Sequence, residues 1–188
     1  MNKTLIFTTL AAIFTFAACS RSAVPKPVGY PRFDLPAKQY RIFDSLCPYS
    51  FDIPVYAQMI PNTGGKFWFD LYFPQYAATI YLSYLPVTGN LDKLLDHSHQ
   101  FVYFHTDKAD AIEAKLIVND GSIGLLSDIG GDSATPMQFF VTDSVRHFLR
   151  GSLYFYSVPN RDSLLPLINF LREDIERLMN SVKFKSQH

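Results

Sequence analysis

Hydrophobic and polar residues alternate most regularly near the C-terminal end of the chain. Two runs rich in aromatic and β-branched residues, 137–142 and 147–156, flank a polar break at Asp143 and Ser144, which predicts a β-hairpin. In the second run, one predicted face carries Leu149, Gly151, Leu153 and Phe155, and the other carries Arg150, Ser152, Tyr154 and Tyr156. This period of two is typical of a strand with one buried face.

A different spacing follows the hairpin. Pro159, Asn160 and Asp162 end the strand and are expected to open a helix. The apolar residues then recur every three or four positions, at Leu164, Ile168, Leu171, Ile175, Leu178 and Val182. Such a stripe predicts an amphipathic helix that buries one side against the neighbouring sheet. Pro166 is expected in the first turn, where a helix tolerates proline.

The rest of the chain predicts more strands and one more helix. We expect strands at 51–57, 66–73, 77–84, 112–118 and 122–129, with turns at 61–65 and 119–121. Asn90 is a candidate N-cap for a helix that continues to about Thr106. The predicted fold class is therefore α+β, an antiparallel β-sheet flanked by two helices. This element order is similar to that of the PsbP and Mog1 proteins.

The N-terminus predicts an exported, lipid-anchored protein. Residues 1–18 combine Lys3 with a short apolar run, which is typical of a signal peptide. The run ends in Ala17-Ala18-Cys19 and resembles a bacterial lipobox, in which Cys19 is acylated and holds the protein on the bilayer. The alternative is an ordinary secretory signal with an incidental cysteine. No acidic run follows Cys19, which favours a Gram-negative envelope lipoprotein that faces the periplasm.

The mature chain is expected to divide into a tether and one domain. Residues 19–48 contain five prolines and read as a proline-rich tether, although Tyr40–Phe43 carries enough aromatic surface to pack on the domain. Residues 49–188 are the predicted single domain. Cys47 is expected to be a small buried side chain, and the alternative is a disulfide between two chains.

Charge and motifs exclude several functions. The chain has 17 basic and 17 acidic residues, which gives no electrostatic basis for binding nucleic acid. The motifs of serine hydrolases, zinc proteases, redox dithiols and dinucleotide-binding proteins are absent, so we expect neither an enzyme nor a cofactor. His97 and His99 would point about 200° apart on a helix, and His105 would lie two turns away from His97, so a shared metal ion is not expected.

Two sets of residues remain as candidates for function. Asp128, Asp132 and Asp143 are predicted at strand ends and could converge with His147 for acid–base chemistry or cation binding. Such aspartates more often cap turns and helices. The second set, Tyr81, Tyr154 and Tyr156, is predicted to point away from the buried face. Either a helix covers these rings or they form an exposed surface for a protein partner.

Several stretches resemble the GldD family of gliding-motility lipoproteins. The longest covers Gln138–Ser144 and His147–Phe155, and shorter ones cover residues 47–51, 78–84, 91–95 and 108–112. Cys19 also matches the cysteine that the family modifies with lipid, of which palmitate is a part. The resemblance implies an envelope lipoprotein needed for gliding, a machinery linked to type IX protein secretion. The family offers no established catalytic residue.

Three hypotheses follow from these observations. The first is a non-enzymatic lipoprotein that assembles or stabilises envelope proteins of the gliding or secretion machinery. The second is a periplasmic binding module for a small ligand or cation at the Asp128–Asp132 loop. The third is an enzyme that uses Asp132 and His147, which requires the two side chains to lie within hydrogen-bonding reach.

Overall fold

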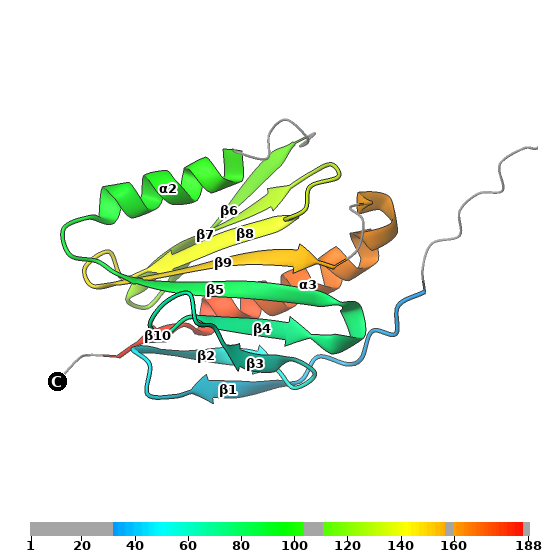
Figure 1. The fold of residues 1–188 in the computed structure, drawn as a ribbon, viewed down its shortest axis with the longest axis horizontal. Helices are drawn as coiled ribbons and strands as arrows, with labels where there is room; N and C mark the ends of the chain where they lie inside the picture. Colours follow the sequence, from blue (N-terminus) through cyan, green and yellow to red (C-terminus); the bar gives the residue numbers. More distant parts are fainter. Residues whose placement is uncertain (1–31, 104–110, 157–159, 186–188) are drawn as a thin grey trace, which may run out of the picture. The chain divides into compact units, whose positions relative to one another are not determined.

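The described residues fold into two antiparallel sheets, two α-helices and a short 3-10 helix at Pro74–Tyr76 (Figure 1). The computed structural model describes residues 32–103, 111–156 and 160–185. The larger sheet has the order β3-β4-β5-β9-β8-β7-β6, and the smaller one has the order β1-β2-β10. The strands of the larger sheet are β3 (Gln58–Pro61), β4 (Phe69–Phe73), β5 (Ala78–Pro86), β6 (Ile112–Asn119), β7 (Ser122–Ile129), β8 (Met137–Thr142) and β9 (His147–Phe155). Those of the smaller sheet are β1 (Tyr40–Asp44), β2 (Tyr49–Pro54) and β10 (Lys183–Phe184).

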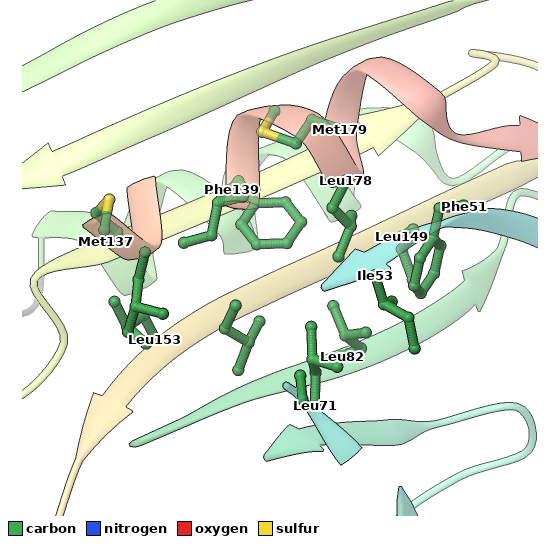
Figure 2. Close-up of a cluster of buried hydrophobic side chains, with 14 of the residues drawn as sticks. Phe51, Ile53, Leu71, Leu82, Met137, Phe139, Leu149, Leu153, Leu178 and Met179 are labelled. Atoms are coloured by element: carbon green, nitrogen blue, oxygen red, sulfur yellow. The ribbon is translucent and has the colours of Figure 1, made fainter. Parts of the chain in front are cut away.

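Helix α3 (Arg161–Ser181) lies on one face of the larger sheet, next to β2. Its predicted stripe is buried except for Leu164, which is half-buried. The inward face of β9 meets the stripe with Leu149 and Leu153, both fully buried. Figure 2 shows side chains of β2, the larger sheet and α3 gathered in this cluster. The antiparallel sheet with two helices confirms the α+β prediction, and the smaller sheet adds a part that the sequence did not indicate.

Helix α2 (Leu91–Tyr103) lies on the opposite face, against β8. The Gln138 amide Nε2 donates to the Phe101 carbonyl over 3.3 Å, and the Arg150 guanidinium lies 4.1 Å from the centre of the Phe101 ring. Only Ser98 and Val102 are buried in this helix. Asn90, the expected N-cap, accepts from the Thr88 amide with its side-chain oxygen, while its carbonyl accepts from Leu94.

The C-terminal hairpin and helix are as predicted, with one correction. Strands β8 and β9 flank the turn at Asp143 and Ser144, and the Asn160 side chain caps α3 by accepting from the Ser163 amide. Pro166 is the sixth residue of α3, so the expectation of a first-turn position is wrong. Because proline has no N–H, the helix lacks one hydrogen bond to the carbonyl of Asp162.

Two predicted strands have different bounds in the structure. The strand expected at 66–73 begins only at Phe69, because Phe67 has a positive φ of 62° and breaks the extended backbone. The strand expected at 51–57 is β2, which begins at Tyr49 and ends at Pro54. The turns at 61–65 and 119–121 lie between strands as expected, and Gly121 takes the positive φ that the second turn requires.

The expected boundary between tether and domain at residue 48 needs correction. Residues 40–44 form β1, which pairs with β2 from Tyr40 opposite Pro54 to Asp44 opposite Ser50. The folded unit therefore includes residues that proline content alone assigned to the tether, and aromatic packing of Phe43 on Phe51 and Phe69 holds them there. Cys47 is buried, as expected.

The lipid-anchor predictions fall on residues outside the described part of the chain. The signal peptide at 1–18, Cys19 and the first part of the tether lie there, as does His105 of the histidine group. Within residues 32–103, 111–156 and 160–185, no helix is long and apolar enough to cross a membrane.

Candidate functional site

The structure separates the four acidic and histidine candidates into two pairs at opposite ends of the sheet. Asp128 lies opposite Met137, where β7 ends and β8 begins. Asp143 and His147 flank the other end of β8, next to Thr142 and Ile123. A strand of six residues spans about 20 Å. The expected convergence of Asp128 and Asp132 with His147 is therefore wrong, because consecutive antiparallel strands place alternate turns at opposite ends.

Asp128 and Asp132 fasten the start of α3. The Asp128 carboxylate pairs with the guanidinium groups of Arg161 and Arg172, at 3.2 Å for Arg161. Asp132 Oδ1 accepts from the Arg161 backbone amide over 2.9 Å. A carboxylate at this position also interacts favourably with the helix dipole. These oxygens thus have protein partners already, and the loop acts as a clamp on the helix.

Asp143 and His147 organise the turn between β8 and β9. Asp143 Oδ1 accepts from the backbone amides of Val145, Arg146 and His147, each within 3.0 Å. Burial alone would raise the pKa of Asp143, but these hydrogen bonds lower it below its ordinary value. Burial lowers the pKa of His147, whose Nδ1 lies 2.9 Å from the Tyr84 hydroxyl. Asp143 and His147 are therefore arranged to stabilise this turn.

The three tyrosines form a connected, solvent-facing group that we call the tyrosine surface: Tyr81, Tyr154 and Tyr156. The hydroxyls of Tyr81 and Tyr156 lie 2.9 Å apart, and the Tyr81 and Tyr154 rings meet edge to face at 5.4 Å. Tyr156 is 61% exposed, and the other two are half-buried. Hydrogen bonding to Tyr156, with some burial, raises the pKa of Tyr81 to about 12, so the Tyr81 hydroxyl is neutral at physiological pH.

All three rings remain at least partly exposed in the structure. The contacts of α2 lie over β8 and Arg150 of β9, while Tyr156 remains exposed beyond the end of β9. Cross-strand contact between Tyr81 and Tyr154 fixes both rings, and the Thr79 hydroxyl lies 3.1 Å from that of Tyr156. The three rings are therefore held in place by contacts within the domain.

The sequence did not lead us to predict a buried polar cluster around Asp174 of α3. Asp174 of α3 is 1% exposed and receives Lys38 Nζ at 2.8 Å, the Tyr40 hydroxyl at 2.9 Å and the Tyr56 hydroxyl at 2.6 Å. Burial lowers the pKa of Lys38 even though Asp174 opposes this effect. The signal was an aspartate between Leu171 and Ile175 in the apolar stripe, because a carboxylate on that face needs buried partners.

The described residues also form an open cleft, at some distance from the tyrosine surface. An open cleft of about 470 Å³ lies between the turn at 119–122, Asp143 and residues 180–184. Ser122 Oγ at its wall is buried without a hydrogen-bond partner. Across the described ranges, no group of three His, Cys, Asp or Glu side chains could hold a metal ion.

The comparisons identify the class and then the family. A lipid-anchored envelope protein is the class that the lipobox-like sequence at Ala17-Ala18-Cys19 indicates. The family model described as gliding motility lipoprotein GldD matches residues 20–184, so the chain belongs to the GldD family, as its sequence resemblance predicted. It is thus a gliding motility lipoprotein of the cell envelope, anchored to a membrane. Comparison with curated proteins gave no match.

Proposed function

We propose that this lipoprotein is a non-enzymatic assembly factor that binds and stabilises envelope proteins of the gliding machinery and of the type IX secretion system linked to it. The tyrosine surface is the observation that carries the proposal. Tyrosine supplies a large, rigid contact area with a polar tip, and it is enriched among residues that dominate binding energy. Membership of the family supplies the process in which the partner works.

In this proposal the acylated Cys19 holds the protein on the bilayer, with the domain on the periplasmic side. Stable anchoring takes two lipid signals, and the acyl chains of a bacterial lipoprotein supply more than that. The proline-rich segment before β1 then acts as a spacer of extended backbone. A tethered domain meets a membrane-bound partner at high effective concentration, so a modest affinity at the tyrosine surface is sufficient.

The competing sequence hypotheses receive less support from the geometry. The Asp128–Asp132 loop was the proposed site for a small ligand or cation, but both carboxylates bind Arg161, and Asp128 also binds Arg172. The hypothetical enzyme needs Asp132 next to His147, and these residues lie at opposite ends of the sheet.

The test is crosslinking in intact cells with variants of the tyrosine surface. Tyr154→Ala and Tyr156→Ala should reduce recovery of gliding or secretion proteins at least tenfold, which corresponds to about 1.4 kcal/mol of binding free energy. Val145→Ser is the matched control, because Val145 is 68% exposed but lies in the turn at the other end of β9. Cys19→Ala supplies the unanchored reference.

Two further measurements make the outcome decisive. Tyr156→Phe keeps the ring and removes the hydroxyl, so it separates packing on the partner from the hydrogen bonds to Tyr81 and Thr79. Thermal melts establish that each variant folds. If both alanine variants fold and recover the same proteins as the unmodified chain, the tyrosine surface does not bind the partner, and the proposal loses its structural basis.

A further inference from the structure

The two edges of the larger sheet differ in how they are protected. β3 at one edge has four residues and ends in Pro61, and both features hinder pairing with another strand. β6 at the other edge has eight residues and no proline. Among the described residues, β6 pairs on one side only, with β7 (Figure 1). A long unprotected edge is where another strand can be added.

One side of β6 also presents an apolar row to solvent. Ile112, Ala114, Leu116 and Val118 share the face of the sheet that carries α2, and Leu116 and Val118 are 60% and 68% exposed. Ile123 of β7 lies opposite Val118 and extends the row. Contiguous exposed apolar surface of this kind marks an interaction site.

The charged residues of β6 point to the opposite face. Lys115 pairs with Glu176 of α3 at 2.8 Å, and Asn119 donates to the Met179 carbonyl. Glu113 shares this face by its position in the strand. An edge lysine can discourage pairing unless a carboxylate of the added strand faces it.

Only every second residue of β6 directs its backbone amide and carbonyl away from β7, and this limits how a second strand could pair. Asn119 and Ser122 flank a two-residue turn, so they form a hydrogen-bonded pair, and Ile117, Lys115 and Glu113 likewise direct their backbone groups to β7. The even-numbered residues from 112 to 118 therefore direct their amides and carbonyls outward. Two copies of β6 can pair antiparallel only in registers that place these residues opposite one another.

Charge then selects one of these registers. A two-fold axis at Glu113 or at Lys115 would place identical charges opposite each other, which destabilises a strand pair. An axis at Ala114 places Glu113 of each copy opposite Lys115 of the other, and Ile112 opposite Leu116. Both opposite-charge pairs then fall at non-hydrogen-bonded positions, where facing side chains approach most closely. The edge is thus complementary to itself.

From this complementarity we infer that β6 is a self-association surface: two copies of this lipoprotein pair antiparallel through β6, centred on Ala114, and join their seven-stranded sheets. The interface is isologous, as in most homodimers. It satisfies the outward backbone groups of residues 112–116 and places Ile112 of each copy beside Leu116 of the other. A bilayer would fit this edge less well, because backbone groups at a sheet edge stay unsatisfied in lipid.

Site-specific crosslinking of the full acylated protein tests the register. Ala114→Cys should give a crosslinked homodimer with a short bifunctional thiol reagent, because facing Cα atoms of such a pair lie about 5.5 Å apart. Val118→Cys is the matched control on the same exposed row. In this register the two copies of residue 118 are about 27 Å apart, eight residues at about 3.4 Å each, and should not crosslink. Cys47 is buried and should leave the unmodified chain uncrosslinked.

Charge exchange tests the complementarity. Glu113→Lys should weaken the dimer about tenfold in sedimentation velocity, since it places two lysine pairs across the interface. Adding Lys115→Glu should restore dimerisation. The melting temperature of each variant should stay the same as that of the unmodified chain. A monomer at all concentrations, or equal crosslinking at positions 114 and 118, would overturn the inference. Crosslinking of position 114 to a different protein alone would also overturn it, and would assign the edge to a strand of that partner.

Discussion

The two faces of the seven-stranded sheet serve different purposes. The face under α3 is closed, and its central residues Leu82, Leu149 and Leu153 are at most 1% exposed. The face under α2 is closed only around β8, and beyond it lie the tyrosine surface on one side and the apolar row of β6 on the other. One face therefore provides the stability of the domain, and the other leaves large side chains available for contact with other molecules.

The largest contrast between the faces should be seen in matched leucine substitutions. Leu153→Ala removes a fully buried side chain from the α3 face and should lower the free energy of unfolding by about 2–5 kcal/mol. Leu116→Ala on the α2 face should change it by about 0.5 kcal/mol or less. Urea denaturation measures both values. Equal losses would show that the apolar row of β6 is part of the core.

Replacing the buried carboxylate of Asp174 on α3 should cause the second-largest loss of stability. Asp174→Asn leaves Lys38 without its charge partner and should cost about 3 kcal/mol, because half of a buried ion pair is more costly than none. Glu173→Gln, an exposed neighbour on the same helix, is the control and should be close to neutral. Addition of Lys38→Met to Asp174→Asn should recover part of the loss. A neutral Asp174→Asn would mean that Lys38 turns to solvent at little cost.

A smaller loss should follow when the glycine of β9 is given a side chain. A Cβ on Gly151 would lie 2.1 Å from Cζ of Phe139, whose ring covers the glycine across the strand pair. Gly151→Ala should therefore destabilise the protein by about 1–3 kcal/mol, the usual cost of overpacking. Phe139→Leu in the same chain should recover part of this loss, which a double-mutant cycle measures. Simple addition of the two losses would argue against the contact.

The smallest effect concerns the pH dependence of stability at His147. Burial lowers the pKa of folded His147, while the unfolded chain takes up a proton near pH 6.5. The unfolded state then binds more protons, so the free energy of unfolding should decrease as the pH falls from about 6.5 towards the lowered pKa. Asp143 and Arg146 are the charged groups that act on this ring.

Substitution of His147 separates this contribution from the others. His147→Gln should flatten the pH dependence within that window. Asp143 affects stability in a different pH range. Because its pKa is lowered in the folded protein, its contribution to the free energy of unfolding is lost only as the pH falls below about 3.8. An unchanged slope in His147→Gln would assign the pH dependence to another group.

Local patterns in the sequence were sufficient to predict most of the helices and strands. Alternation along 147–156 predicted that Leu149, Gly151 and Leu153 of β9 are buried, although Phe155 is only half-buried. The spacing of Leu164 to Val182 predicted most of the buried stripe of α3. Both succeed because one-sided burial imposes a period on consecutive residues. Residues 147–155 also carry part of the resemblance to the GldD family, and thus indicate the process in which the protein acts.

Only the tertiary structure decided which distant residues meet. It paired 40–44 with β2, brought Lys38, Tyr40 and Tyr56 to Asp174, and separated Asp132 from His147 by the length of a strand. It also left β6 as an edge and Tyr156 uncovered. Sequence periodicity specifies which side of an element is buried, but strand order and register depend on contacts between segments far apart in the chain. For this reason the sequence determined the elements and the family, and the fold determined the surfaces available for binding.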